Sequence, residues 1–293
     1  MRIFISGGTG FVGKHLCREL LARGHSLKIL VHRRVGAPEQ NVVQVEGDVT
    51  SPESVLSAMA GCDAAINLVG IIREFPDRGI TFQRLHVQAT ATVVDMAVKA
   101  GIGRYLHMSA LGVRTEASSG YHRSKYAAEE HVRRSPLNST IFRPSVIFGP
   151  EDAFINQLAS LVRLLPAVPV IGNGRYRLQP IHVDDVARCF AMALENPETV
   201  GQTYALCGPD RVSYNELLDL VGAALGKKGV RKIHAPLGLM QFFVPLLQNI
   251  PSFPLTVDQL TMLLEESICD GIWQHSFPFT PTPLKEGMCS YLC

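Results

Sequence analysis

The sequence predicts an α/β fold in which a doubly wound parallel sheet is joined to a smaller, mostly helical C-terminal lobe. Three observations support this fold class. Short apolar, β-branched segments alternate with segments of helical period along the first half of the chain. These apolar segments lack polar alternation, as expected for strands that helices cover on both faces. The 293 residues, 46% hydrophobic and 18% charged, are enough to bury a large core.

Six strands are expected in the first half, at residues 2–6, 27–32, 42–45, 64–69, 104–109 and 139–147. Helices are expected between them at residues 11–23, 82–100 and 121–134. Gly24 and Gly101 follow the first two of these helices, and glycine is the residue that most often ends a helix. After Pro150 the pattern changes to a helix at 153–165, strands at 178–183 and 202–207 around a helix at 184–195, and then mostly helical segments.

This change of pattern predicts two domains. Residues 1–150, with 175–207 returning to the sheet, form the first domain. Residues 151–174 and 208–293 form the smaller lobe, which would contact a substrate or a partner.

Composition excludes several classes of protein. The net charge of +2 provides no electrostatic surface for nucleic acid, so we expect no nucleic-acid partner. The seven cysteines include no CxxC pair and the ten histidines no HExxH motif, so neither a disulfide framework nor a metal site is expected. The first residues lack the apolar core of a signal peptide, and no run of about 18 apolar residues occurs. These features favour a cytoplasmic location.

A glycine-rich loop directly follows the first expected strand and opens the first helix. Gly7 would permit a tight turn, Gly10 a close approach of the backbone to a pyrophosphate, and Gly13 close packing of the helix on the sheet. The N-terminus of the helix would offer N–H groups and a positive dipole end to the phosphates. The loop therefore predicts an NAD(P)-binding Rossmann domain, with cofactor contacts from Gly7, Thr9, Gly10, Phe11, Val12 and Gly13.

Basic residues follow the second strand. An NAD-binding domain usually has an acidic residue there, which binds the ribose hydroxyls. Here His32 is followed by Arg33 and Arg34, which suit a 2′-phosphate, so NADP(H) is preferred over NAD(H). Asp48 and Val49 follow the third strand, also as cofactor-binding candidates. The Asp48 carboxylate would either accept a hydrogen bond from the adenine amino group or cap the next helix.

Tyr121 and Lys125 form a Tyr-x-x-x-Lys pair at the start of the helix at 121–134. Residues i and i+4 share one helical face, so the charge of Lys125 would lower the pKa of Tyr121. The hydroxyl would then donate or accept a proton near neutral pH. Ser109 ends the fifth strand, at the edge where α/β sheets bind ligands, and would hold a carbonyl or alcohol oxygen. These three residues are the candidate catalytic residues.

With these motifs the chain resembles the extended and atypical branch of the short-chain dehydrogenase/reductase superfamily, the NAD-dependent epimerase/dehydratase family. The resemblance also includes the segments 67–70, 108–110, 143–150 and 179–187. It implies that Tyr121 is the acid/base, that Lys125 binds the nicotinamide ribose and that Ser109 polarises the reacting oxygen. It further implies cofactor contacts from Leu68, Val69, Gly70, Pro144 and Val146.

Two features depart from the family pattern. The family's Asn-Val-x-Gly-Thr motif on the long helix is replaced by a segment that begins with His86. The resemblance gives that asparagine a helix contact or a proton-relay role, and the sequence leaves the role of His86 in its place open. The segment between Ser109 and Tyr121 is also shorter than in sugar-nucleotide epimerases, which removes a usual substrate-binding loop.

Two functions of different class follow. The first is an oxidoreductase or epimerase that transfers a hydride between NADP(H) and a carbonyl or alcohol carbon of an unknown small molecule, transiently in the case of an epimerase. The second is a non-catalytic protein that holds NADPH within a larger respiratory or membrane assembly. Within the family the chain most resembles bacterial relatives of the NADPH-carrying accessory subunit of mitochondrial complex I. Basic residues at 227–232 beside the apolar segment 235–250 would give the C-terminal lobe a peripheral contact with a membrane or protein complex.

Overall fold

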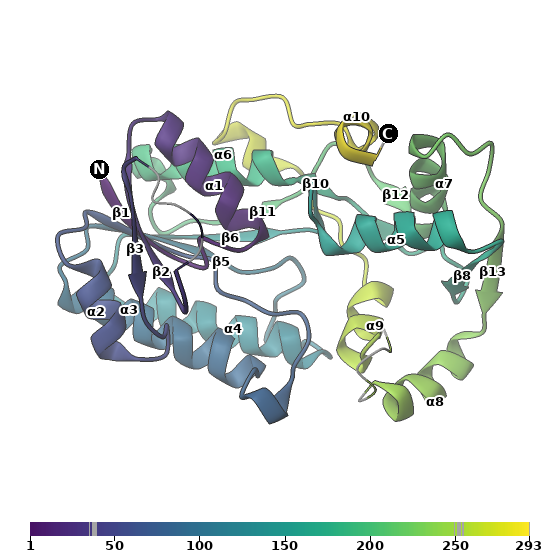
Figure 1. Cartoon of the computed structure of the whole chain (residues 1–293), viewed down its shortest axis with the longest axis horizontal. Coiled ribbons are helices and arrows are strands. Elements are labelled where there is room, and N and C mark those ends of the chain that lie inside the picture. The colour runs from purple at the N-terminus through teal and green to yellow at the C-terminus, as the bar shows by residue number, and fades with distance from the viewer. Residues whose placement is uncertain (35, 37–39, 249, 251–252, 254, 293) are drawn as a thin grey trace. The chain divides into compact units, whose positions relative to one another are not determined.

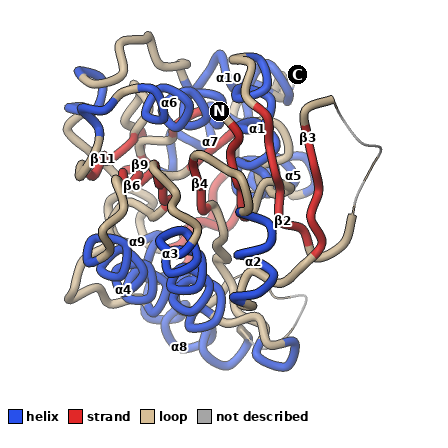
Figure 2. Tube along the Cα trace, turned by 90° about the vertical axis from the view of Figure 1, so that its left-hand side faces the viewer, coloured by secondary structure: helices blue, strands red, loops and turns tan. Residues whose placement is uncertain are grey.

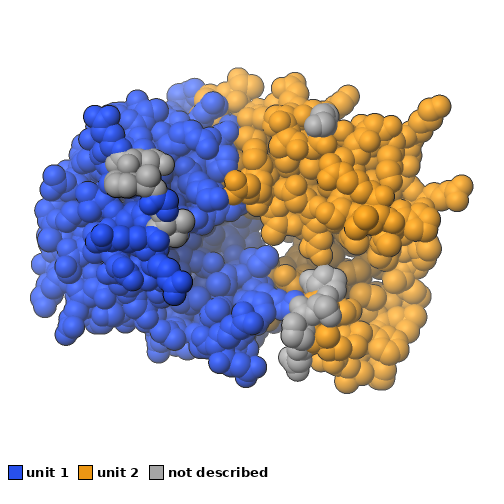
Figure 3. Space-filling model, viewed as in Figure 1, with its two compact units in different colours: residues 1–144, 184–205, 272–278 blue, residues 145–183, 206–271, 279–293 orange. Residues whose placement is uncertain are grey.

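The computed structural model of the chain describes residues 1–34, 36, 40–248, 250, 253 and 255–292. It divides into two compact units, coloured separately in Figure 3. Unit 1 comprises residues 1–144, 184–205 and 272–278, and unit 2 comprises residues 145–183, 206–271 and 279–293. Each unit has its own hydrophobic core.

Unit 1 is built on a seven-stranded sheet with the order β11-β6-β5-β4-β1-β2-β3. Strands β1 to β6 pair in parallel, and Ile5 lies opposite Ile29 of β2 and Ile66 of β4. The chain leaves β1 in one direction across the sheet and resumes at β4 in the other. This switch point is where open α/β sheets bind ligands, beyond the carboxyl ends of the strands. The strands are β1 (Arg2–Ser6), β2 (Ser26–Val31), β3 (Val42–Glu46), β4 (Ala64–Asn67), β5 (Arg104–Met108), β6 (Ser139–Pro144) and β11 (Thr203–Leu206).

Helices cover both faces of this sheet (Figures 1 and 2). Helices α1 (Phe11–Ala22) and α6 (Val183–Glu195) lie on one face. Helices α2 (Pro52–Met59), α3 (Ala89–Lys99) and α4 (Gly120–Arg134) lie on the other. Phe4 of β1 is fully buried and belongs to the same apolar cluster as Val55 of α2 and Val93 of α3. The predicted α/β fold class is confirmed, and the strands lack polar alternation because both faces are covered.

Unit 2 has a core between three helices, α5 (Ala153–Leu164), α7 (Tyr214–Ala224) and α10 (Leu284–Leu292). Its strands form two-stranded sheets. The pairs are β7 (Ile147–Phe148) with β10 (Ile181–His182), β9 (Arg177–Leu178) with β12 (Val212–Ser213), and β8 (Val168–Ile171) with β13 (Lys232–Ala235). Helices α8 (Leu237–Leu247) and α9 (Val257–Leu264) follow β13 in the chain. In the part of the chain that is described, no helix has the length and apolar character needed to cross a membrane.

Three expected elements are corrected by the structure. The strand expected at 139–147 ends at Pro144, and Ile147–Phe148 pairs with β10 instead. The strand expected at 178–183 is two short strands in two different sheets of unit 2, separated by Pro180, which has no N–H to donate to a ladder. The helix expected at 82–100 begins as the π-helical segment Gln83–Gln88 before it continues as α3.

Several segments group differently from the predicted domains. Residues 145–150, 175–183 and 206–207 belong to unit 2, whereas residues 272–278 belong to unit 1. In that last segment Phe277 is fully buried, and its ring lies 5.0 Å from Tyr204 and 5.9 Å from Phe142. Apolar packing against the sheet therefore assigns this late segment to unit 1.

Unit 2 contains a disulfide between Cys207 and Cys269, whose Cα atoms lie 6.1 Å apart. The expectation of no disulfide, which rests on the absence of CxxC spacing, is therefore wrong for this pair. The two cysteines are 62 residues apart in the sequence, so only the tertiary fold brings them together.

Candidate functional site

The glycine-rich loop forms the turn between β1 and α1 at the switch point of the sheet. Gly7 has a φ of +80°, and a Cβ added at Gly13 would lie 2.3 Å from the Gly7 carbonyl oxygen. The Gly10 N–H donates to the same oxygen over 3.1 Å, and Gly10 has no side chain to cap α1. The loop is thus a cradle of bare backbone at a helix N-terminus, which fits a pyrophosphate.

The predicted cofactor residues around this turn differ in exposure. Thr9 and Gly10 are exposed, Phe11 is half-buried, and Val12 is buried. At the end of β2, on the same edge of the sheet, His32, Arg33 and Arg34 are all exposed.

Asp48 lies just after the end of β3, and its carboxylate holds a local turn. Its Oδ1 accepts hydrogen bonds from the N–H and the hydroxyl of Thr50, both at 2.8 Å, and its Oδ2 lies 3.0 Å from Nη2 of Arg84. Burial acts to raise the pKa of Asp48, but these bonds and charges lower it on balance. Helix α2 is capped by the Ser51 hydroxyl, which excludes the capping role considered for Asp48. Val49 is buried in the core beside α2.

A buried asparagine shapes the turn after β4. Asn67 Oδ1 accepts hydrogen bonds from the Ser6 hydroxyl at 2.9 Å and from the Val69 N–H at 3.1 Å. Its Nδ2 donates to the Thr90 hydroxyl of α3 at 3.2 Å. Asn67 therefore fixes the turn at residues 68–70 between the glycine-rich loop and α3. The sequence shows Asn67 only as part of a motif, and its contacts depend on the pairing of β1 with β4.

Lys125 brings the Tyr-x-x-x-Lys helix to the carboxyl edge of the sheet. Its buried Nζ donates to the carbonyl oxygen of Met108 at 3.1 Å and to that of Val69 at 3.4 Å. Met108 is the last residue of β5, and Val69 follows the end of β4. A Cβ added at Gly70 would lie 2.9 Å from this Nζ. The structure thus brings together the turn at 68–70, the end of β5 and the start of α4.

Ser109 and Tyr121 lie beside this lysine in the chain fold. Ser109 follows Met108, and its buried Oγ has no hydrogen-bond partner among the described residues. A buried hydroxyl without a partner is uncommon and suits a substrate oxygen. Tyr121 precedes Lys125 by one helical turn, and its ring packs against Phe82 and His86 at 5.8 and 5.3 Å between centroids.

The protonation states differ from those the sequence predicts. Burial raises the pKa of Tyr121 to about 12 and lowers the pKa of Lys125 to about 8. The expectation that Lys125 lowers the pKa of Tyr121 is therefore wrong for this structure. The cause is desolvation of the phenol, while the ammonium is directed at two backbone carbonyls. Tyr121 thus holds its proton at neutral pH.

His86 lies in the π-helical segment and makes two contacts through its ring. Its Nε2 accepts a hydrogen bond from the Ile71 N–H at 3.0 Å, so Nδ1 carries the proton and donates to the Ser124 hydroxyl at 2.8 Å. The Ser124 hydroxyl donates in turn to the Tyr121 carbonyl at 2.7 Å. His86, at the position of the family asparagine, thus joins the turn after β4 to α4.

We expect acid to destabilise the fold in part through His86. In the unfolded chain this imidazole is protonated below pH 6.5, whereas in the folded chain burial, and secondly the charge of Lys125, lowers its pKa to about 2. The unfolded state therefore binds more protons as the pH falls below 6.5, and between pH 7 and pH 5 the free energy of unfolding should drop by about 2 kcal/mol. Urea titrations at both pH values measure this. In the His86→Asn variant the free energy of unfolding should drop by about 2 kcal/mol less than in the parent chain between pH 7 and pH 5. An equal drop in both chains would show that His86 is not the source of the acid sensitivity.

A buried ion-pair cluster supports α4 behind the lysine. Glu129 is fully buried and accepts hydrogen bonds from Arg143 Nε at 2.7 Å and from Arg133 Nη2 at 2.6 Å. Its charge acts against the burial that lowers the pKa of Lys125. Sequence reasoning missed Glu129, although Lys125, Glu129 and Arg133 recur every four residues and so share one helical face.

The last two predicted cofactor residues lie in different units. Pro144 is buried at the end of β6, where its carbonyl accepts a hydrogen bond from the Leu111 N–H at 2.8 Å. Val146 belongs to unit 2, and its carbonyl accepts from the Ile181 N–H at 2.9 Å. Within the described part of the chain, no group of three His, Cys, Asp or Glu side chains could hold a metal ion.

Comparison with known protein families identifies the family of this chain. Residues 3–207 match the NAD dependent epimerase/dehydratase family. The chain belongs to this family. The matched range includes the glycine-rich loop, Ser109, Tyr121 and Lys125. The predicted membership of the family is thereby confirmed.

Two curated relatives show the range of proteins in this family that are similar to the chain. NADH dehydrogenase [ubiquinone] 1 alpha subcomplex subunit 9, mitochondrial, of Mus musculus is 32% identical over 216 residues, 71% of this chain and 56% of that protein. The 2-alkyl-3-oxoalkanoate reductase of Stenotrophomonas maltophilia is 27% identical and covers 98% of this chain and 97% of its own length. The chain spans between 56% and 62% of the length of the four alpha subcomplex subunit 9 relatives.

Solved structures share the fold of this chain. The UDP-glucose 4-epimerase of Thermus thermophilus, solved in complex with NAD, has a TM-score of 0.76. It is 18% identical, and the match covers 100% of this chain and 98% of that chain.

Proposed function

We propose that this chain is an oxidoreductase that transfers a hydride between NADP(H) and a carbonyl or alcohol carbon of a small molecule. The observation that carries the proposal is the position of Lys125, whose ammonium bonds the carbonyls at the ends of β4 and β5. This contact holds Tyr121 and Ser109 at the edge of the sheet beyond which open α/β folds bind dinucleotides. Family membership and the similarity to a 2-alkyl-3-oxoalkanoate reductase support the same reaction class.

The residues present fit such a cofactor. Gly7, Gly10 and Gly13 leave bare backbone where a pyrophosphate would bind, and the absence of a side chain at Gly70 lets the Lys125 ammonium approach the turn at 68–70. By resemblance to the family, Lys125 would bind the nicotinamide ribose. A bound nicotinamide would give or take the hydride.

The chain's own groups would act on the substrate oxygen. The Ser109 hydroxyl, buried and without a partner among the described residues, would donate a hydrogen bond to that oxygen. Tyr121, which is protonated at neutral pH because burial raises its pKa to about 12, would then give its proton to the oxygen of a carbonyl substrate. In the reverse reaction, alcohol oxidation, the phenolate of Tyr121 would accept the proton of the alcohol.

We expect NADPH to bind at least about tenfold more tightly than NADH. The physical reason is that Arg33 and Arg34 are exposed at the end of β2, and a hydrogen bond to a charged group contributes about 1.5–3 kcal/mol. Replacing both arginines by serine should remove most of this preference and leave NADH binding nearly unchanged. Titration calorimetry measures both affinities. Arg134→Ser, which changes an exposed arginine of α4, is the control, and equal affinities of the parent chain for the two cofactors would refute the preference.

A second candidate is a non-catalytic protein that holds NADPH within a larger assembly. The similarity to NADH dehydrogenase alpha subcomplex subunit 9 favours it. A holder requires the cradle of glycines but gains nothing from a proton donor. The two candidates therefore differ in whether the Tyr121 hydroxyl is needed.

A further inference from the structure

Helix α8 of unit 2 exposes an apolar face. Leu239, Phe242, Phe243 and Leu246 are exposed by 51%, 65%, 44% and 64%. Their spacing of i, i+3, i+4 and i+7 places all four on one face of the helix. Single exposed apolar residues are common, but four on one helical face mark an interaction site.

The opposite side of α8 already has its packing. Val244 is fully buried, and α8 lies next to α9 within unit 2. The helix is therefore apolar on two sides, of which the side with Val244 packs within unit 2.

The chain segment that contains α8 carries charges of one sign, up to Asp258 at the start of α9. Residues 226–257 include Lys227, Lys228, Arg231 and Lys232 but no Asp or Glu. Lys232 pairs with Asp219, and Lys227 donates to the carbonyl of Val162. Lys228 and Arg231 are exposed ahead of β13, the strand that precedes α8.

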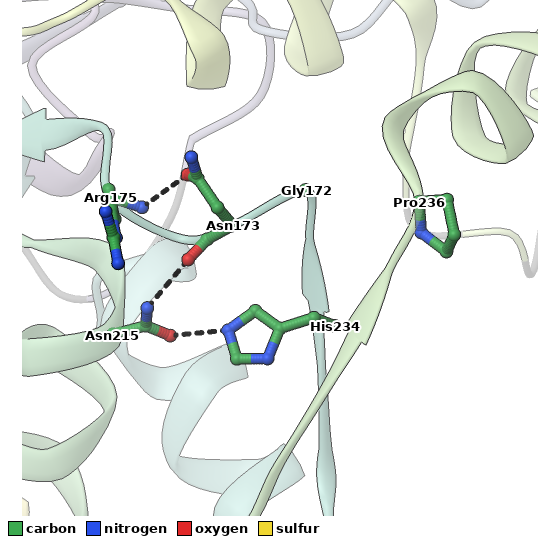
Figure 4. Close-up of a pocket in the computed structure, with 6 residues that line it drawn as sticks. All are labelled: Gly172, Asn173, Arg175, Asn215, His234 and Pro236. Carbon is green, nitrogen blue, oxygen red and sulfur yellow. Dashed lines mark hydrogen bonds between the residues drawn. The ribbon is translucent and has the colours of Figure 1, made fainter.

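A polar depression of about 600 Å³ lies at the start of α8 (Figure 4). Asn215 is held there between the Asn173 carbonyl and the ring of His234, with contacts of 2.9 and 3.3 Å. Arg175 lines the same depression and adds another exposed cation. The lining residues are Gly172, Asn173, Arg175, Asn215, His234 and Pro236.

We propose that α8 binds the surface of a membrane that contains anionic phospholipid. The face formed by Leu239, Phe242, Phe243 and Leu246 would enter the boundary between headgroups and acyl chains, parallel to the membrane plane. Lys228, Arg231 and the depression with Arg175 would face the headgroup phosphates. A two-fold contact with a second copy is disfavoured, because it would bring together two segments that both carry cations and no acid.

Sedimentation with vesicles tests the proposal without any cofactor or substrate. The chain should sediment with vesicles of phosphatidylcholine and phosphatidylglycerol, less with phosphatidylcholine alone, and less again at high salt. Phe242→Ser combined with Leu246→Ser should lower the partition coefficient at least tenfold, because two apolar side chains no longer leave water. Lys228→Gln combined with Arg231→Gln should lower it by about fivefold per charge. The matched controls are Leu164→Ser, at an apolar residue 81% exposed on α5, and Lys285→Gln, at an exposed cation of α10.

A fluorescent variant distinguishes the occupants of this face. The single tryptophan, Trp273, is 1% exposed, so Phe242→Trp adds an exposed reporter to a constant background. Its emission should shift to the blue when anionic vesicles are added. Absence of binding by the parent chain, or equal loss in the Leu164→Ser control, would overturn the proposal. A blue shift that depends on protein concentration without lipid would instead assign the face to a second copy, and would also overturn it.

Discussion

Replacing Tyr121 with phenylalanine should lower kcat for carbonyl reduction by a factor of about 10²–10⁴ while cofactor affinity stays nearly unchanged. Only the hydroxyl is lost, and the ring contacts with Phe82 and His86 are kept. The expected loss follows from the high pKa of Tyr121, because a phenol that is protonated at neutral pH is the proton donor of the proposed reaction. Steady-state kinetics on a carbonyl substrate found by screening, with calorimetry of NADPH binding, measures both quantities.

Two variants of the same helix serve as controls. Tyr126→Phe removes a hydroxyl from a half-buried neighbour and should leave kcat unchanged. Lys125→Ala should weaken both turnover and cofactor binding, because Lys125 also joins the ends of β4 and β5. Full activity of Tyr121→Phe would remove Tyr121 from the reaction. If no carbonyl substrate is turned over by the parent chain although NADPH binds, the non-catalytic candidate is favoured.

The variant Gly13→Ala should weaken NADPH binding by roughly 100-fold or more, since at least two hydrogen bonds to phosphate would be lost. A Cβ at this position would lie 2.3 Å from the Gly7 oxygen and 2.6 Å from the Gly8 carbonyl carbon. Both are backbone atoms, so the loop itself must move and the cradle opens. Calorimetry measures the affinity, and thermal unfolding measures the accompanying loss of stability, about 1–3 kcal/mol for an overpacked site.

Gly229→Ala is the matched control for this change. A Cβ at Gly229 would meet no atom within 4 Å, and its φ is not positive. The control should bind NADPH as the parent chain does. Unchanged affinity in Gly13→Ala would show that phosphates do not bind at this loop.

Local features of the sequence predicted the first strand, the first helix and the start of α4 in unit 1. Strand β1 is observed at Arg2–Ser6 as expected, and α1 begins at Phe11 directly after the glycine-rich loop. Tyr121 and Lys125 lie one helical turn apart at the start of α4. Glycine spacing and i, i+4 spacing act within about ten residues, and each apolar strand or amphipathic helix is marked by its own periodicity, so these patterns can be interpreted without the fold.

Other features required contacts between distant segments. Asn67 acquires its role only when Ser6 of β1 and Thr90 of α3 lie beside it. Glu129 becomes a buried acceptor because Arg143, on the neighbouring strand β6, reaches it. The raised pKa of Tyr121 has the same origin, since burial is a property of the packed molecule and not of the four-residue motif.

The sequence by itself determined the parallel α/β class through the alternation of strands and helices. It determined the glycine-rich turn and the shared helical face of Tyr121 and Lys125 because these depend on residue types at short and fixed spacing. The tertiary structure alone decided that residues 177–182 leave the main sheet, that Cys207 pairs with Cys269, and that Lys125 is directed at two backbone carbonyls. It also decided which face of α8 is packed and which is exposed. The physical reason is common to all of these. Strand partners, disulfide pairs and the burial of a charge or an apolar face are set by which distant segments pack together, and a local pattern carries no information about that choice.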